Sequence, residues 1–178
     1  MKILALVFIL GFMASEDFEI DFGTETGGKN WRVVNDDVMG GRSASEAFLK
    51  KESLYFKGNV SLENNGGFAS IRSPYQKMDL SGFKSVTIRH RGTSRNFALS
   101  FDRYTAWYRP NYKYEFVPNE EWQETTIKLS DFRESRVGRY TGNTMPEEAQ
   151  SEIIRMGIIL YDKKAGPFEL EVDYIRFD

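Results

Sequence analysis

The stretch FKSVTIRHR, residues 83–91, alternates apolar and polar side chains along its length. Val86, Ile88 and His90 fall on one side of an extended chain, and the residues between them fall on the other. A period of two is typical of a β-strand that buries one face and exposes the other. The pattern therefore predicts a strand whose Val86 side points into a hydrophobic core.

The same alternation recurs over most of the chain. Phe97, Leu99 and Phe101 follow it, as do residues 18–22, 67–72, 112–117, 122–129, 153–161 and 167–177. Residues 54–62 predict a further pair of strands, bent around Gly58. Only residues 145–154 indicate a helix, with Pro146 at its start. Many short strands with almost no helix predict an all-β sandwich or barrel.

Composition narrows the class of protein. The 178 residues suffice for one domain with a sizeable core, and 14 Phe, 9 Tyr and 3 Trp favour strands and binding surfaces. A net charge of −2 is of the wrong sign for a nucleic-acid binder. The absence of cysteine excludes disulfides, thiolate zinc sites and cysteine nucleophiles.

The first fifteen residues, MKILALVFILGFMAS, have the form of a signal peptide. Lys2 is followed by an apolar run over residues 3–12 and then by the small residues Ala14 and Ser15. The run is too short for a comfortable membrane span. An uncut N-terminal anchor is the alternative, because Phe12 stands three residues before a cut after Ala14, where signal peptides prefer a small residue. We therefore expect export to the periplasm or the extracellular space, with one domain over residues 16–178 and no stable membrane span.

No catalytic residue is nominated by the sequence. The single histidine, His90, lacks the partners of a triad or a zinc site, and there is no G-x-S-x-G motif. Carboxylates are plentiful, but no pair stands out as in a glycosidase. We expect a protein that is not an enzyme and needs no cofactor, with a hydrolase as the least favoured hypothesis.

The segment NWRVVNDDVMGGRS, residues 30–43, clusters acidic and amide side chains beside two glycines. Such groups can hold calcium, and the candidate ligands are Asp21, Asp37 and Asp173. No spacing here matches a known calcium loop, so we favour a structural turn. We expect Gly40 and Gly41 to permit the turn, with Asn35 and Asp37 bracing it and Trp31 and Met39 packing beneath. A second turn of this kind is predicted at Asn64, Asn65, Gly66 and Gly67.

The segment DRYTAWYRPNYKY, residues 102–114, concentrates aromatic and basic side chains in a stretch that resembles a loop. Exposed rings with arginines favour recognition, because rings supply apolar contact and arginine pairs with acidic groups. Asp102 would orient an arginine or accept a bond from a ligand hydroxyl. The alternative is that half of these rings cover the edge of the sandwich. The predicted ligand-binding residues are Arg72, Arg89, Asp102, Trp107, Tyr108, Arg109, Tyr112 and Tyr114.

Several of these stretches together resemble the complex I intermediate-associated protein 30 family. The specific ones are WRVVNDDVMGGRS and LYFKGNVSLENNGGFASIRS, and the weaker ones are FKSVTIRHRG, EWQETTIKLSDF and IIRMGIILYDKKAGPFELEVDYIRF. They run in family order from about residue 18 to 177. One departure is Lys128-Leu129, where the family tends to have Pro-Phe.

The resemblance implies a galactose-binding-like jelly roll, in which two antiparallel sheets pack face to face with at most one or two short helices. It also implies a chaperone-like role, because mitochondrial members are assembly factors for respiratory complex I and have no known catalytic residues. Those members work on the matrix side, whereas this chain is predicted to be exported. The leading hypothesis is a non-catalytic domain that binds a protein client, and the alternative is an exported carbohydrate-binding module.

Overall fold

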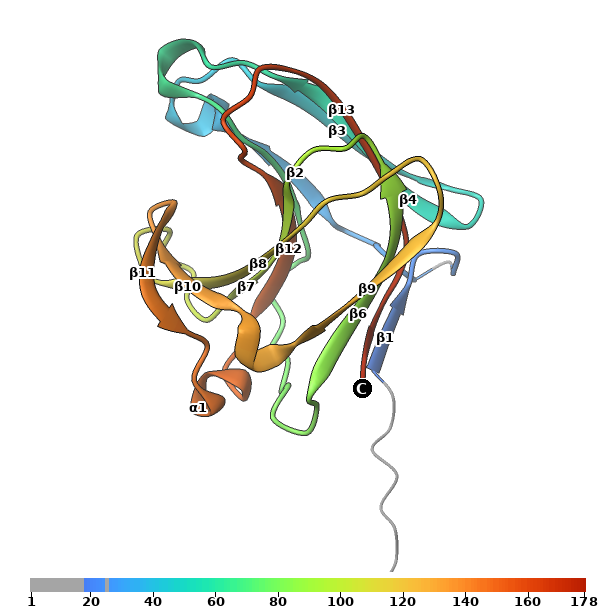
Figure 1. Ribbon diagram of the computed structural model, residues 1–178, viewed down its shortest axis with the longest axis vertical. Coiled ribbons are helices and arrows are strands. Elements are labelled where there is room, and N and C mark those ends of the chain that lie inside the picture. Colours follow the sequence, from blue (N-terminus) through green and yellow to red (C-terminus); the bar gives the residue numbers. More distant parts are fainter. Residues whose placement is uncertain (1–17, 25) are drawn as a thin grey trace, which may run out of the picture.

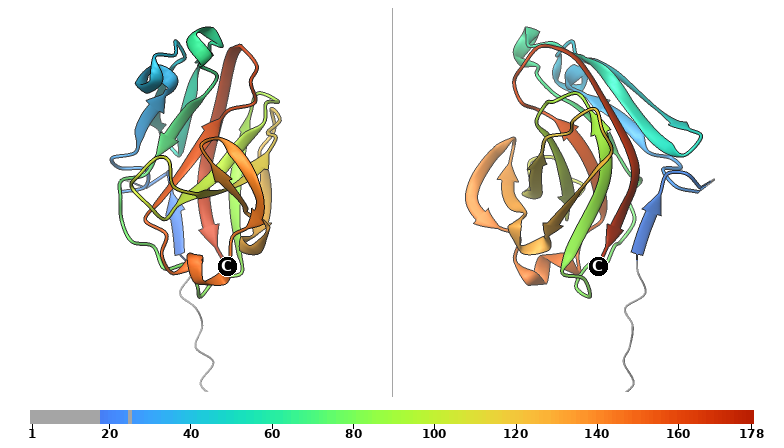
Figure 2. Two further views of the ribbon diagram at one scale, coloured as in Figure 1. Left: turned by 90° about the vertical axis from the view of Figure 1, so that its left-hand side faces the viewer. Right: turned by 45° about the vertical axis from the view of Figure 1, so that its right-hand side comes forward.

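The computed structural model describes residues 18–24 and 26–178, which form two β-sheets packed face to face (Figures 1 and 2). Every pair of neighbouring strands is antiparallel. The predicted all-β jelly-roll sandwich is confirmed. The predicted signal peptide at residues 1–15 lies outside the described residues.

Sheet A has the order β3-β4-β13-β6-β9. The short strand β1 pairs with residues 174–177 of β13, beyond the residues of β13 that pair with β4. Its strands are β1 (Phe18–Asp21), β3 (Ala44–Lys50), β4 (Ser53–Val60), β6 (Ser85–Gly92), β9 (Gln123–Lys128) and β13 (Gly166–Phe177). Sheet B has the order β11-β10-β8-β7-β12-β5-β2. Its strands are β2 (Arg32–Asn35), β5 (Ala69–Arg72), β7 (Phe97–Asp102), β8 (Asn111–Phe116), β10 (Arg133–Arg136), β11 (Arg139–Thr144) and β12 (Arg155–Leu160).

Helix is confined to single turns in the described residues. The α-helix α1 (Glu147–Gln150) begins after Pro146 and carries two glutamates in its first turn, inside the segment predicted to be helical. Three 3-10 turns complete the set: η1 (Asp36–Met39), η2 (Glu63–Asn65) and η3 (Leu129–Asp131).

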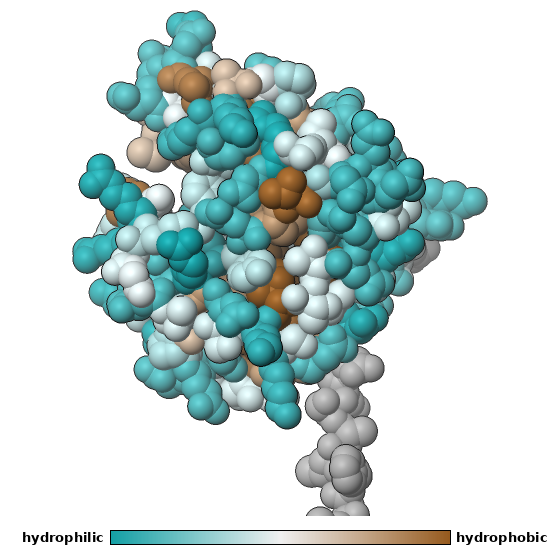
Figure 3. Space-filling model, viewed as in Figure 1, coloured by the Kyte–Doolittle hydropathy of each residue, from teal (hydrophilic) through white to brown (hydrophobic). Residues whose placement is uncertain are grey.

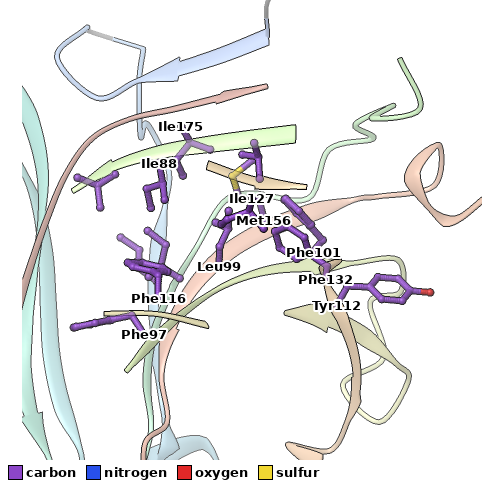
Figure 4. Close-up of a cluster of buried hydrophobic side chains, with 14 of the residues drawn as sticks. Ile88, Phe97, Leu99, Phe101, Tyr112, Phe116, Ile127, Phe132, Met156 and Ile175 are labelled. Atoms are coloured by element: carbon purple, nitrogen blue, oxygen red, sulfur yellow. The ribbon is translucent and has the colours of Figure 1, made fainter. Parts of the chain in front are cut away.

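The core lies between the two sheets and follows the alternation of the sequence. Val86, Ile88 and His90 are all fully buried on the inner face of β6. In Figure 4, Ile88 and Ile175 of sheet A lie over Leu99 of sheet B. Burying one such side chain stabilises the fold by roughly 1.5–3 kcal/mol, so this interface dominates the stability.

The predicted strand pair around Gly58 is wrong, because β4 runs through that position without turning. The backbone of the paired edge strand β3 approaches β4 closely at this point, so that a Cβ on Gly58 would lie 2.3 Å from the Ala44 carbonyl oxygen. Glycine is therefore required for close approach rather than for a bend. Leu62, which was placed in the second strand of that pair, is 46% exposed.

Asp36 ties the two sheets together at one rim of the sandwich. Its Oδ1 accepts the Ser43 backbone N–H at 2.8 Å, and its Oδ2 accepts the Gly67 N–H at 2.6 Å and the Ser43 hydroxyl at 2.5 Å. Ser43 precedes β3 of sheet A, whereas Gly67 precedes β5 of sheet B. Burial alone would raise the pKa of Asp36, but these hydrogen bonds outweigh it and lower the pKa.

The glycines of both turns make room for this carboxylate. A Cβ on Gly41 would lie 2.3 Å from Asp36 Oδ1, and a Cβ on Gly66 would lie 2.7 Å from Asp36 Oδ2. Gly40 has φ of 86° and Gly67 has φ of 118°, values that favour glycine. The glycines of these two turns thus act in two ways: some adopt a positive φ, and others leave room for the close approach of the Asp36 carboxylate.

Other expectations for the first turn need correction. Asn35 and Asp37 do not brace it: Asn35 Oδ1 accepts from the Ser45 hydroxyl, and Asp37 Oδ1 only from the N–H of the next residue. Met39 does not pack beneath, because its side chain is 66% exposed. Trp31 is half-buried and makes an edge contact with Phe22 at 5.3 Å between ring centroids.

The second predicted turn is formed by two asparagines in the left-handed region. Asn64 has φ of 55° and Asn65 has φ of 60°. The Asn64 side-chain amide donates to the Gly40 carbonyl at 3.0 Å, so the two turns are hydrogen-bonded to each other.

Candidate binding surface on the outer face of sheet B

No other strand or helix of the described chain packs on the face of sheet B that points away from sheet A (Figure 1). Its profile is hollowed in Figure 3, between the tip that carries η1 and η2 and the β10–β11 hairpin. We call this surface the sheet B face. Its polar residues, by strand register, are Arg32, Ser70, Arg72, Ser100, Asp102, Asn111, Lys113, Glu115, Arg133, Ser135 and Arg155.

One row of this face is cationic. Register places Arg32 opposite Arg72, Arg72 opposite Gly157, Gly157 opposite Ser100, Ser100 opposite Lys113, and Lys113 opposite Arg133. The row therefore contains four cations, separated in the middle by two small residues, and no carboxylate. We call Arg32, Arg72, Lys113 and Arg133 the cationic row.

Lys113 is the central member of the cationic row and is only 5% exposed. Its Nζ lies 4.6 Å from the Tyr161 ring centroid, and no carboxylate of residues 18–24 or 26–178 forms an ion pair with it. Burial lowers the pKa of Lys113 to about 8, and the charge of Arg72 lowers it further, against opposing contributions from Asp102 and Glu115. A buried ammonium without a counter-charge is costly unless something else binds it.

Arg72 is similarly without an ion pair in the described structure. Its Nε donates to the Ser70 hydroxyl at 3.2 Å. Burial lowers its pKa, and the neighbouring Arg155 adds to the effect. Asp102, the nearest acidic candidate, is instead held by Arg155 through bonds of 2.7 and 2.8 Å.

Glu115 is also occupied by neighbours on the same face. Its carboxylate accepts hydrogen bonds from the hydroxyls of Tyr140 and Tyr161 at 2.6 and 2.7 Å, and from the Asn96 amide at 2.7 Å. Burial alone would raise its pKa, but these bonds lower it. Burial and the Glu115 bond together raise the pKa of Tyr140 to about 12. Glu115 forms no direct ion pair with Lys113, although its negative charge favours the protonated lysine.

One acceptor on the face is left without a donor. Asn111 Oδ1 is buried and has no hydrogen-bond partner in the described part of the chain. Asn111 and Lys113 lie two residues apart on β8, so they point to the same side. The centre of the face thus holds a cation without an ion pair beside an acceptor without a donor.

The tyrosine rings around this face are each covered by a cation. Arg133 lies 3.7 Å from the Tyr140 ring centroid, and Arg155 lies 4.3 Å from that of Tyr75. Lys113 covers Tyr161 in the same way. One face of each of these rings is therefore engaged in a cation–π contact.

The predicted ligand-binding residues divide into three groups. Arg72 and Asp102 lie on the sheet B face. Trp107, Tyr108 and Arg109 lie in the β7–β8 loop at its end, where Trp107 is 70% exposed and Tyr108 is 53% exposed. The loop is joined to β10 by a bond from Arg136 Nε to the Tyr108 carbonyl at 3.3 Å.

The other three residues require correction. Tyr112 is 2% exposed and Tyr114 packs against the core, because both share the inner side of β8 with Phe116. Arg89 lies on the outer face of sheet A, where it forms an ion pair with Asp173. These residues are therefore not part of the sheet B face.

Residues that sequence reasoning missed include Lys113, Asn111 and Arg155. A signal was available, since the alternation that places Tyr112 and Phe116 inward places Asn111 and Lys113 outward.

The calcium candidates do not converge. Asp21 Oδ1 accepts the Gly23 N–H, Asp37 accepts the Val38 N–H, and Asp173 pairs with Arg89. Across residues 18–24 and 26–178, no three acidic or histidine side chains gather closely enough to hold a metal ion. Within the same residues, no helix has the length and apolarity to cross a bilayer.

Sequence comparison identifies related proteins. The family model described as Complex I intermediate-associated protein 30 (CIA30) matches residues 20–172. The mouse (Mus musculus) protein named "Complex I intermediate-associated protein 30, mitochondrial" is 31% identical over 169 residues, covering 82% of this chain and 51% of its own. The chain therefore spans about half the length of this curated relative.

Solved structures with the same architecture include a family 11 carbohydrate-binding module of the cellulosomal cellulase Lic26A-Cel5E of Clostridium thermocellum. It superposes with a TM-score of 0.68 at 14% identity, covering 92% of this chain and 95% of the module. A family 11 module from the same organism, in complex with a β-1,3-1,4-mixed-linked tetrasaccharide, has a TM-score of 0.64 at 14% identity, with 90% and 94% covered. At this identity the likeness concerns the fold alone.

Proposed function

Since the chain belongs to the complex I intermediate-associated protein 30 family, we propose that it is a non-catalytic binding domain with an assembly-factor-like role. Its partner is a protein client, held on the sheet B face and the adjoining β7–β8 loop. The observation that carries this proposal is the open chemistry of the sheet B face. Lys113 is buried there without an ion pair, and Asn111 Oδ1 is buried without a hydrogen-bond donor, in the described chain.

A binding face of this kind is physically reasonable. The buried side chains hold their positions before a ligand arrives, so little conformational entropy is lost on binding. The exposed Trp107 and Tyr108 add aromatic contact at the end of the same surface, and aromatic side chains are enriched in protein interfaces.

Site-specific cross-linking tests the proposal. A photoreactive phenylalanine analogue would replace Trp107 in the loop, or Lys128 on the edge strand of sheet A as the matched control. Irradiation in native cells should then link the Trp107 variant, and not the Lys128 variant, to a defined protein. Equal labelling from both positions, or no protein product from position 107, would contradict the proposal.

Carbohydrate binding is the second candidate function. It is favoured by the TM-scores of 0.68 and 0.64 to family 11 modules, one of which holds a tetrasaccharide. The exposed ring of Trp107 would then stack on the sugar. Titration with β-1,3-1,4-glucan oligosaccharides would quench Trp107 fluorescence in the wild type and leave Trp107→Phe, which retains Trp31 and Trp122, unchanged. A client-binding domain would show no quenching.

We also propose that the protein is exported by the signal peptide at residues 1–15. The supporting features are the Lys2 charge and the apolar run that follows it. Fractionation of native cells and N-terminal sequencing would test this. A mature N-terminus near residue 16 in an envelope or secreted fraction supports export with cleavage, whereas retention of Met1 in a membrane fraction indicates the anchor instead.

A further inference from the structure

The charge of the sheet B face differs in sign from that of the whole chain. The chain carries a net charge of −2, yet the cationic row contains four cations and no carboxylate. The nearest carboxylates are already engaged, Asp102 by Arg155 and Glu115 by Tyr140, Tyr161 and Asn96. The ligand that complements this face must therefore bring negative charge.

The spacing of the row suits an extended chain. Arg72 on β5 and Lys113 on β8 are separated by β12 and β7, which is three strand spacings of about 4.8 Å each, or about 14 Å. In an extended peptide the side chains of residues i and i+4 point the same way and lie about 13 Å apart. One peptide lying across the strands could thus present two carboxylates to the two cations.

The cation-covered rings argue against a neutral sugar as the ligand of this row. One face of each of the rings of Tyr140, Tyr75 and Tyr161 is covered by a cation, so less aromatic surface is left among them for a sugar ring. A carboxylate has no need of such a surface, because it pairs with the guanidinium or ammonium directly.

We propose that the sheet B face binds an acidic, extended polypeptide segment, whose carboxylates pair with Lys113 and Arg72. This inference rests on the proposed function and specifies the chemistry of the client. The segment carries acidic side chains four residues apart and crosses β8, β7, β12 and β5.

Fluorescence anisotropy with a labelled hexaglutamate peptide tests the inference on the full-length protein. Lys113→Met and Arg72→Gln should each weaken binding about tenfold, which is the loss expected for one charge-assisted pair. Arg91→Gln, a matched loss of charge on sheet A, should change it less than twofold. Equal weakening by Arg91→Gln would show diffuse electrostatics and overturn the inference, as would binding that all three variants leave unchanged.

The pH dependence provides a second readout. Burial lowers the pKa of Lys113 to about 8, so the free ammonium loses its proton as the pH rises through that value. Wild-type affinity for hexaglutamate should then fall several-fold between pH 7 and 9.5, while Lys113→Arg, which stays charged, should retain it. Identical profiles for the two proteins would contradict the role of Lys113.

Two competing ligands separate the sources of negative charge. Hexagalacturonate supplies carboxylates on a sugar backbone, and a β-1,3-1,4-glucan oligosaccharide supplies none. Tighter binding of either than of hexaglutamate would overturn the polypeptide assignment. Failure of hexaglutamate while cross-linking at position 107 persists would remove this inference alone, whereas loss of both would remove the proposed function as well.

Discussion

The outer faces of the two sheets differ in how many of their cationic side chains form ion pairs. On sheet A, Arg91 pairs with Glu171 at 2.8 Å, Lys57 pairs with Glu46 at 3.1 Å, and Arg89 pairs with Asp173. On sheet B, Arg72 and Lys113 have no such partner in the described chain. These three cations of sheet A are neutralised by carboxylates of the same sheet, whereas Arg72 and Lys113 are left to be neutralised by something else.

This difference shows that the shape of a surface is a weaker guide to binding than its unsatisfied groups. Sheet A carries a groove of about 560 Å³ lined by Lys50, Tyr55, Arg91 and Glu171 among others. Arg91 and Glu171 pair with each other there, and Tyr55 donates to Glu169 at 2.5 Å. A ligand there would have to replace good internal bonds, so it would gain little.

The largest expected effect comes from removing the Asp36 carboxylate, whose hydrogen bonds join the two sheets at one rim of the sandwich. Asp36→Ala leaves the Ser43 and Gly67 amides buried without acceptors, so unfolding should become easier by about 3 kcal/mol or more. Chemical denaturation measures this, with Asp37→Ala as the neighbouring control, expected within about 0.5 kcal/mol. A loss below about 1 kcal/mol for Asp36→Ala would contradict this role.

The pH dependence of the same link has a defined sign. The pKa of Asp36 is lower in the folded protein, so its contribution is complete above the ordinary aspartate value and is lost as the pH falls through the folded value.

Paired and unpaired charges should respond to neutralisation with opposite signs. Glu171→Gln weakens the bonds from Arg91 and Ser53 and should destabilise the protein by about 1–3 kcal/mol. Lys113→Met removes a buried ammonium without a partner and should stabilise it by about 1–3 kcal/mol. Thermal and urea unfolding at pH 7 compare the two variants. Destabilisation by Lys113→Met would mean that its charge is satisfied within the protein.

Lys113 also has a pH signature in stability. Its pKa is about 8 when folded and 10.5 as the ordinary value, so the folded protein releases the proton first. Wild-type stability should therefore rise, relative to Lys113→Met, as the pH increases from 8 to 10.5.

An effect of intermediate size is expected from the inner side of sheet A. His90 is fully buried, its Nε2 lies 2.9 Å from Thr125 Oγ1, and burial lowers its pKa to about 4. Because the unfolded chain takes up a proton near pH 6.5, stability should fall as the pH decreases from 6.5 towards 4. His90→Leu should reduce the fall between pH 7 and 5 by about 2 kcal/mol, as measured by urea titrations. If His90→Leu loses as much stability as the wild type between pH 7 and 5, His90 is not the source of that loss.

The smallest effect compares one arginine on the outer face of each sheet. Arg91→Gln breaks a half-exposed ion pair on sheet A and should cost about 0.2–1 kcal/mol, decreasing in high salt. Arg72→Gln on sheet B should cost nothing or stabilise slightly, because no ion pair is lost. Salt-dependent denaturation midpoints separate the two. A salt-sensitive loss for Arg72→Gln would place it with the paired charges.

Much of the architecture could be predicted from the sequence, because alternation is a local property that burial enforces. Val86, Ile88 and His90 share the buried side of β6 as expected. Alternation does not show where strands pass each other closely, which is why Gly58 was interpreted as a bend. The predicted helix was too long, since only one turn after Pro146 forms before β12 begins.

The candidate site was less accessible to prediction. Tyr112 and Tyr114 were assigned to a ligand because aromatic side chains favour both surfaces and cores, and only the neighbouring strands decide between them. Lys113 became significant only when register placed it across from Arg133 and away from any free carboxylate. The bracing role that Asp36 holds was assigned to Asn35 and Asp37, because three polar residues in a row do not reveal which one turns inward.

The position of the last two strands has a consequence for how the molecule forms. β12 lies between β7 and β5, and β13 lies between β4 and β6, so neither sheet is continuous until residues 155–177 have been added. Partial chains emerging from the ribosome would carry hairpins with open edges, which tend to aggregate. We therefore expect folding to be completed only after these two strands have been added, with the slow kinetics typical of long-range strand pairing.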